Sequence, residues 1–191
     1  MSNVVIKDYG YFNDDALENI VAYGLRIEKY ELSIPSPCIW WGGSGVLLST
    51  PQAAINCFKV TKRLCDKDNG NILHHVIITL NERYEVNNAQ FEAREIAKEI
   101  SIELGNAGFQ NLYFIHWEEV RKAHIHLVLN SINFLTGNRI NSTGWLGNTI
   151  QSYLKLNFNN FNWGNNPIYD KEKYYRTYWC YQYVISCMIR N

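Results

Sequence analysis

The sequence predicts a single α+β domain in which helices pack on a sheet. Short segments rich in β-branched or alternating apolar residues indicate strands, whereas longer segments carry apolar residues at helical spacing. Neither an internal repeat nor a clear linker divides the chain. Its 191 residues, 47% of them hydrophobic, can bury one substantial core. We therefore expect residues 1–191 to form one layered domain.

Four segments are predicted to be helices: residues 15–29, 49–65, 88–104 and 145–158. In the first, Asp15 followed by Glu18 is typical of a helix N-terminus. In the second, Ser49 or Thr50 can cap the helix, and Pro51 occupies its first position. The third begins at an asparagine, ends at a glycine and has the clearest apolar stripe.

Three segments are predicted to be strands: residues 71–82, 111–117 and 123–134. The first, "NILHHVIITLNE", is short and rich in β-branched residues. Residues 34–52 combine proline dipeptides with a glycine cluster and are expected to form a loop, and residues 135–141 a turn. Residues 174–189 could be either strand or helix.

The composition narrows the classes of function. Eighteen basic and eighteen acidic residues give zero formal net charge, which argues mildly against a nucleic-acid-binding protein. Basic side chains nevertheless gather in "KVTKRLCDK" and "EEVRKAH", which indicate either a local positive surface or merely solvated faces. With no membrane-length apolar stretch and no secretory signal, we expect a cytoplasmic protein without a membrane partner.

The cysteines indicate neither a disulfide framework nor a cysteine zinc site. They are odd in number and scattered, and none has C-x-x-C spacing. We expect all five to be reduced thiols: Cys38, Cys57, Cys65, Cys180 and Cys187.

Three of the five histidines fall in one short stretch, "HWEEVRKAHIH". Because alternate side chains of a strand share a face, His124 and His126 point the same way. An antiparallel hairpin around residues 117–123 would bring His116 beside His124. A histidine on a strand is often only hydrogen-bonded or solvated, but three converging imidazoles favour a metal, since they would otherwise repel on protonation. Nitrogen-only ligation suits a catalytic ion.

This stretch resembles the signature motif of the relaxases of plasmid mobilisation and conjugation, within the HUH endonuclease superfamily. That motif has a histidine, an acidic residue two positions on, then His-x-His, apolar residues and an asparagine, with a Thr-Gly-Lys-like turn downstream. The chain offers these in order before "LTGNRI": His116, Glu118, His124, His126 and Asn130. "LHHVIITLNE" also resembles the family's His-x-x-x-Ser-Phe strand. Three positions depart from the pattern: Thr79 replaces serine, Glu118 aspartate and Asn138 lysine.

The resemblance implies both a fold and a reaction. The fold is a central, mostly antiparallel sheet of about five strands with flanking helices. The reaction is the nicking of single-stranded DNA at an origin of transfer by a tyrosine, through a 5′-phosphotyrosyl intermediate, with relaxosome accessory proteins as further partners. A divalent ion on His116, His124 and His126 would be Mn²⁺ or Mg²⁺ by resemblance, whereas imidazole affinity alone favours Zn²⁺ or another late transition metal.

The resemblance also implies a nucleophilic tyrosine in an N-terminal helix, a few residues before a Glu-Lys pair. "LENIVAYGLRIEKYE" places Tyr23 there, off the stripe of the predicted helix that runs from Leu17 to Gly24. An ordinary half-buried tyrosine is the alternative, and the rival nucleophiles are Tyr30, Tyr11 and Tyr9. Glu118 would orient a ligand histidine or help to take the tyrosine proton, or else be a solvated loop carboxylate.

Aromatic side chains could partly replace net positive charge in binding DNA, since stacking is worth about 1–3 kcal/mol per base. Trp40, Trp41 and Trp117 are the candidates, with core packing as the alternative. The motifs and the basic run add further candidates for DNA contacts: His75, Thr79, Arg121, Lys122 and Asn130.

Two other functions remain compatible with the sequence. A rolling-circle replication initiator or single-tyrosine transposase uses similar His-x-His chemistry but carries its nucleophile after the histidines, near Tyr153, Tyr169 or Tyr174. A non-catalytic DNA-binding or metal-binding module would bind DNA without forming a covalent product.

Overall fold

The computed structural model describes residues 1–7, 10–33, 40–80, 86–118, 122–140 and 142–170. In these residues six strands form one sheet with the spatial order β2-β4-β5-β3-β1-β6. The strands are β1 (Asn3–Lys7), β2 (Trp41–Ser44), β3 (Leu73–Thr79), β4 (Phe109–Glu118), β5 (Lys122–Asn133) and β6 (Ile168–Asp170). Neighbours are antiparallel except β1 and β6, which are parallel. The predicted α+β class with a mostly antiparallel sheet is confirmed.

The described helices are α1 (Ala16–Leu25), α2 (Pro51–Leu64), α3 (Val86–Asn106) and α4 (Thr143–Asn157), with a 3₁₀ helix at Lys29–Ser33. Each α-helix overlaps a segment predicted to be helical, although α3 and α4 begin two residues earlier than predicted and α3 also ends two residues later. The Thr50 hydroxyl caps α2 by accepting from the Ala53 N–H at 3.0 Å, as expected for that position. Helix α1 is shorter than predicted, because Arg26 adopts a left-handed conformation with φ of 57° and ends it.

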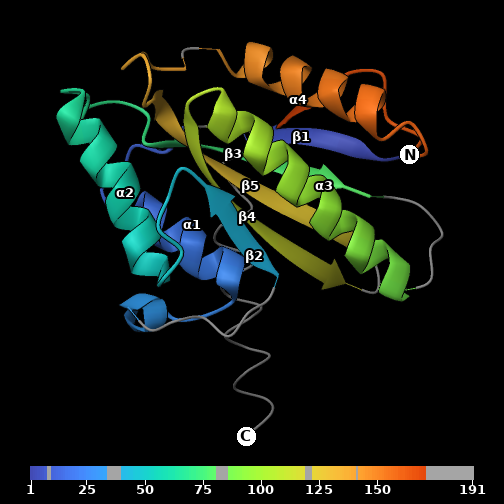
Figure 1. Ribbon diagram of the computed structural model, residues 1–191, viewed down its shortest axis with the longest axis horizontal. Helices are drawn as coiled ribbons and strands as arrows, with labels where there is room; N and C mark the ends of the chain where they lie inside the picture. The colour runs from blue at the N-terminus through green and yellow to red at the C-terminus, as the bar shows by residue number, and fades with distance from the viewer. Residues whose placement is uncertain (8–9, 34–39, 81–85, 119–121, 141, 171–191) are drawn as a thin grey trace, which may run out of the picture.

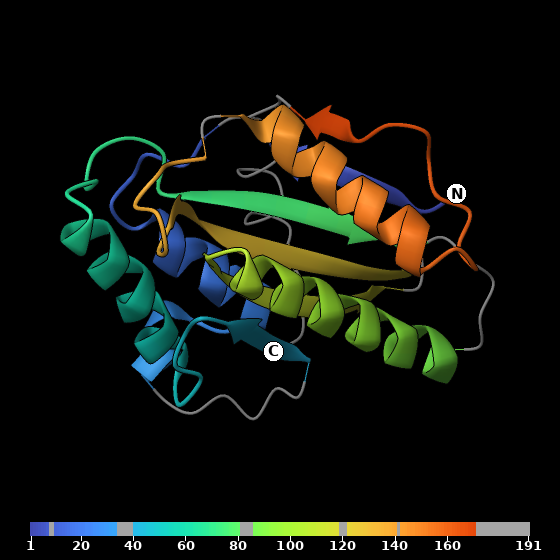
Figure 2. The same cartoon turned by 45° about the horizontal axis from the view of Figure 1, so that its top comes forward.

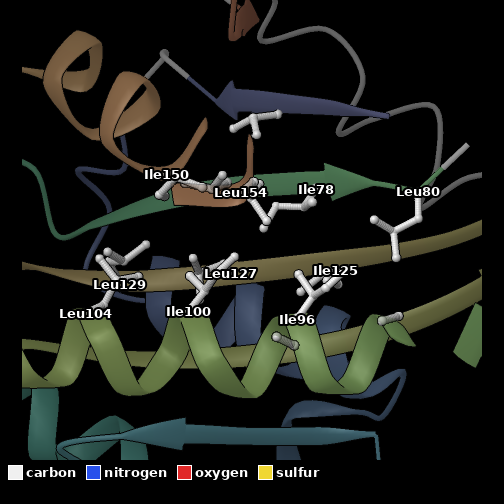
Figure 3. Close-up of a cluster of buried hydrophobic side chains, with 14 of the residues drawn as sticks. Ile78, Leu80, Ile96, Ile100, Leu104, Ile125, Leu127, Leu129, Ile150 and Leu154 are labelled. Carbon is white, nitrogen blue, oxygen red and sulfur yellow. The ribbon is translucent and has the colours of Figure 1, made fainter. Parts of the chain in front are cut away.

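Helices cover both faces of the sheet (Figures 1 and 2). Helices α3 and α4 pack their aliphatic side chains on one face, which we call the α3/α4 face (Figure 3). Helices α1 and α2 pack on the other, the α1/α2 face. Alternation along β5 separates the two: Ile125, Leu127 and Leu129 join the α3/α4 core, whereas Val128 joins the α1/α2 core.

The prediction of a loop across residues 34–52 was wrong for Trp41–Ser44, which form strand β2 against β4. Two of the three glycines that suggested a loop serve close packing instead. A Cβ on Gly42 would collide with the Tyr113 hydroxyl, and one on Gly43 with the carbonyl oxygen of Asn111. Strands β1 and β6 were also not predicted, since both are short.

Several expectations concern parts of the chain outside the described residues, among them the segment 174–189 and three of the cysteines. Cys57 and Cys65 carry free thiols, as expected. Among the described helices, none combines the length and the hydropathy needed to span a membrane.

Candidate active site

The β4–β5 hairpin brings three imidazoles together on the α1/α2 face. His116 and His124 stand directly opposite each other across the antiparallel pair, and His126 follows on the same face of β5. One nitrogen from each ring lies within 4.8 Å of the corresponding nitrogens of the other two, and all three side chains are buried. The predicted convergence of these histidines is confirmed, and we call them the histidine cluster.

Helix α1 contacts this cluster through a backbone carbonyl. His116 Nε2 lies 2.7 Å from the carbonyl oxygen of Gly24, and the two residues are 92 positions apart in the chain. A carbonyl oxygen can only accept, so Nε2 carries the proton and the ring's lone pair is on Nδ1. A Cβ on Gly24 would stand 2.5 Å from the ring of Phe114, so a glycine is needed for α1 to approach β4 this closely.

Tyr23 precedes that glycine, and its ring lies against the histidine cluster. The ring centroid is 5.4 Å from that of His126 and 5.9 Å from that of His116, both in edge-on geometry. The side chain is 51% exposed, so a solvent-borne substrate can reach it. Helix α1 achieves this by burying the opposite stripe, which includes Leu17, Ile20 and Val21, in the α1/α2 core.

His126 uses one nitrogen for a hydrogen bond and keeps the other without a partner. Its Nδ1 lies 2.9 Å from Nε2 of His75, whose Nδ1 lies 3.0 Å from the hydroxyl of Tyr11. Its Nε2 is buried and has no hydrogen-bond partner among the described residues. Burial, and secondarily the neighbouring imidazoles and Lys7, hold the pKa of His126 well below its usual range, which keeps the ring neutral.

The donor set fits a divalent metal ion. Neutral imidazole nitrogens are good ligands for such ions, and a cluster of three leaves coordination positions open. A buried nitrogen without a partner costs free energy unless a ligand satisfies it, and His126 Nε2 is such an atom. His116, His124 and His126 are therefore positioned to bind a metal.

The tryptophans predicted to stack on DNA lie on different faces. Trp41 is opposite Phe114 across β2 and β4, and it packs on the α1/α2 core, the same face as the histidine cluster. Trp40 and Trp117 pack against the α3/α4 core. All three tryptophans are partly buried, and stacking on DNA stays a prediction for each of them.

The predicted DNA-binding residues of β3 and β5 make internal hydrogen bonds. Thr79 lies opposite His124, and its hydroxyl donates to the carbonyl oxygen of Asn3. Asn130 is fully buried, and its amide donates to the carbonyl oxygen of Phe58. His75 is also buried, bonded to His126. Asn130 and His75 would have to become exposed to contact DNA, whereas Thr79 is only partly buried, and all three contacts stay predictions.

The hairpin turn lies largely outside the described residues. Arg121 lies outside the described residues, and for Glu118 and Lys122 the structure describes only the backbone, where they pair with each other in register at the end of the hairpin. Their predicted roles stay predictions.

Sequence reasoning missed the contributions of Gly24 and Tyr11. Tyr11 was weighed only as a rival nucleophile, but it is 2% exposed and bonded to His75. Gly24 was read as one more position on a helical stripe. The only available signal was a glycine directly after the expected nucleophile, which is weak without the fold.

The fold and the histidine cluster together define an α+β protein with a candidate catalytic metal centre. Residues 38–156, more than half of the chain, match the family model of the MobA/VirD2-like relaxase nuclease domain. The chain therefore belongs to this family. No curated protein and no solved structure matched it.

Family membership makes the protein a relaxase nuclease domain, an enzyme class that cleaves nucleic acid and binds single-stranded DNA at an origin. The matched range contains the whole histidine cluster but begins after Tyr23.

Proposed function

We propose that the protein is a site- and strand-specific DNA relaxase that nicks and rejoins single-stranded DNA at an origin of transfer of a plasmid or other mobile element. One observation carries the proposal beyond family membership. Tyr23, an exposed tyrosine, has its ring 5.4 Å from His126 and 5.9 Å from His116, in a chain whose family cleaves nucleic acid.

In this proposal Tyr23 is the nucleophile. Its phenolic oxygen attacks the scissile phosphorus and forms a phosphotyrosyl bond to the 5′ side, while the bond to the 3′ oxygen breaks and that oxygen leaves as a 3′-hydroxyl. The phosphodiester energy stays in the protein–DNA bond, so the reverse attack by a 3′-hydroxyl rejoins the strand. The position of the Tyr23 ring, 5.4 Å from that of His126, supports this role, because such an attack requires the nucleophile to be held close to the scissile group.

The histidine cluster would hold the divalent ion, with His126 offering Nε2 and His116 offering Nδ1. When bound, the ion offsets phosphate charge and orients the scissile group. Mn²⁺ or Mg²⁺ is the ion proposed from the family, and Zn²⁺ or another late transition metal is the alternative from ligand chemistry.

Two proton transfers complete the scheme. The phenol of tyrosine has a pKa near 10, so it must lose its proton as it attacks, and the 3′ oxygen must gain one as it leaves. Glu118, two residues along β4 from His116, is proposed to take the tyrosine proton or to orient a ligand histidine.

The substrate contacts are proposed to be mostly aromatic and local. The formal net charge of zero supplies no general attraction for DNA, so binding should be modest and salt-sensitive. Trp41, on the face of the cluster, is proposed to stack on a base near the scissile phosphate. Accessory proteins of the relaxosome are proposed to add affinity.

The test is cleavage of single-stranded origin oligonucleotides with Mn²⁺ by wild type, Tyr23→Phe and Tyr30→Phe. Tyr30 is the matched control, because it is 79% exposed and lies in the 3₁₀ helix after α1. We expect covalent adduct from wild type and Tyr30→Phe and none from Tyr23→Phe. Cleavage that survives in Tyr23→Phe would move the nucleophile elsewhere.

The placement of two other tyrosines disfavours the initiator or transposase alternative. Tyr153 and Tyr169 both pack against the α3/α4 core, on the other side of the sheet from the histidine cluster. Tyr174 lies outside the described residues. An adduct on any of these three would favour that alternative, and binding without an adduct under any divalent ion would favour the non-catalytic module.

A further inference from the structure

A row of two buried hydrogen bonds joins His126 of the histidine cluster to His75, and His75 to Tyr11. Tyr11 Oη lies 3.0 Å from His75 Nδ1, and His75 Nε2 lies 2.9 Å from His126 Nδ1. Tyr11, His75 and His126 are 2%, 3% and 3% exposed. The rings of His75 and His126 are stacked, with centroids 5.2 Å apart. The proposed reaction uses neither Tyr11 nor His75.

The protons in this row can be arranged in two directions. In one, the Tyr11 hydroxyl donates to His75, and His75 donates to Nδ1 of His126, whose own proton is then on Nε2. In the other, His126 donates from Nδ1 to His75, and His75 donates from its Nδ1 to the oxygen of Tyr11. Only the second direction leaves a lone pair on Nε2 of His126, the nitrogen that is buried without a partner.

We propose that Tyr11 and His75 are positioning residues that hold His126 in the tautomer and orientation in which Nε2 can bind the metal. His75 fixes the ring by accepting from Nδ1–H of His126 at its Nε2, and the oxygen of Tyr11 accepts a hydrogen bond from Nδ1–H of His75. This inference rests on the proposed metal-dependent function and adds two residues to the site.

At the end of the row away from the histidine cluster, the backbone of Tyr11 is held by two hydrogen bonds. The Tyr11 backbone N–H donates to Oδ1 of Asn71 at 2.7 Å, and its carbonyl accepts from the N–H of Ile72 at 2.7 Å. These contacts tie the segment before α1 to the start of β3, the strand that carries His75. Tyr11 is therefore a fixed acceptor, and its burial makes it a poor candidate for attack on DNA.

The test measures metal binding in the absence of DNA. Mn²⁺ is titrated by calorimetry into metal-free wild type, Tyr11→Phe, His75→Leu and His75→Gln. Tyr169→Phe is the matched control, because it removes a tyrosine hydroxyl that donates to the carbonyl oxygen of Gly144, beyond the α3/α4 face. A thermal melt of each metal-free variant checks folding.

We expect Tyr11→Phe and His75→Leu to weaken Mn²⁺ binding about 10-fold or more, the range for partners of ligand histidines. His75→Gln, whose amide oxygen can accept from His126, should recover part of that loss. Tyr169→Phe should bind as wild type does. If Tyr11→Phe does not fold, the difference between His75→Leu and His75→Gln decides the same point.

A second measurement observes the tautomer directly. Imidazole ¹⁵N spectra of the Zn²⁺-loaded wild type should show His126 protonated on Nδ1 and bound through Nε2. Equal Mn²⁺ affinity in wild type, Tyr11→Phe and His75→Leu, or ligation through Nδ1 of His126, would overturn the inference while leaving the nuclease proposal intact. The expected affinity losses in a protein that forms no DNA adduct would support the inference and overturn the nuclease proposal.

Discussion

Alternate residues of the same strands line the two faces of the sheet, and the two faces carry different kinds of side chain. On the α3/α4 face, β5 contributes Ile125, Leu127 and Leu129 to an aliphatic core. On the α1/α2 face, the intervening positions are His124 and His126, which the helix carrying Tyr23 partly covers. Apolar packing on the α3/α4 face stabilises the hairpin and can offset the free-energy cost of burying polar imidazoles on the other face.

The largest loss of DNA nicking is expected from a substitution on the α1/α2 face. His126→Ala removes the nitrogen positioned for the ion, so Mn²⁺-dependent adduct formation should fall by more than about 100-fold, beyond the loss typical of outer partners. The measurement is single-turnover nicking of an origin oligonucleotide. His74→Ala is the control, because this buried histidine pairs with Leu129 on β5 and is not in the cluster. An equal loss in both variants would contradict a local role for His126.

A loss of stability without a loss of nicking is expected at Ile125, which precedes His126 in the chain but packs in the α3/α4 core. Ile125→Ala leaves a cavity in the α3/α4 core, and the free energy of unfolding should fall by about 2–5 kcal/mol. Urea denaturation measures the loss. Nicking per folded molecule should stay near that of wild type, and a selective loss of nicking without loss of stability would show that the two faces are not separable.

Gly24→Ala tests how tightly α1 is fitted to the cluster. The new Cβ would meet the Phe114 ring at 2.5 Å and push α1 from β4, lowering the free energy of unfolding by about 1–3 kcal/mol. Adduct formation should fall more than Mn²⁺ affinity, because Tyr23 moves with the helix.

The matched variant for this prediction is Gly24→Ala combined with Phe114→Leu, which makes room for the methyl group. It should recover part of both losses in denaturation and nicking assays. Wild-type nicking in Gly24→Ala alone would show that the placement of Tyr23 is not critical.

The smallest expected effect is a change in the free energy of unfolding, and it concerns a buried lysine of α2. Lys62, on α2, is 5% exposed, and its Nζ has no hydrogen-bond partner among the described residues. Burial, and then the nearby Arg139, lower its pKa from 10.5 to about 8, although Asp68 opposes the shift. Below that pKa the folded protein holds a buried charge, which costs free energy.

Lys62→Met should therefore raise the free energy of unfolding at pH 7 by about 1–2 kcal/mol. Between pH 8 and 10.5 the Lys62 amine is protonated in the unfolded chain but largely neutral in the folded protein, so the free energy of unfolding of wild type rises with pH through this window. The difference in stability between Lys62→Met and wild type should therefore shrink as pH rises. Denaturation at pH 7 and pH 9.5 measures this, with the exposed Lys98→Met as control. If the stability of Lys62→Met relative to wild type increased with pH, the lowered pKa of Lys62 would be contradicted.

The sequence predicted those features that depend on local periodicity. Strand alternation placed His124 and His126 on one face, and the hairpin brought His116 beside them, so the histidine cluster could be predicted before the fold was known. The helices followed from caps and stripes, as the Thr50 cap of α2 shows.

Features that depend on long-range packing could not be predicted in this way. Strand β2 was read as a loop because its glycines suggest turns, and only the fold shows Gly42 meeting Tyr113. The hydrogen bond from His116 to Gly24 joins residues 92 apart, and the one between Tyr11 and His75 joins residues 64 apart. No pattern along the chain encodes such contacts.

The most direct test of the central claim is mass spectrometry of the peptide–DNA adduct formed by wild type with Mn²⁺ and candidate origin oligonucleotides. We expect a single adduct on the peptide that contains Tyr23, with the 5′ phosphate attached to its oxygen and a free 3′-hydroxyl on the released strand. An adduct on Tyr11, Tyr30 or a tyrosine after the histidine cluster would contradict it.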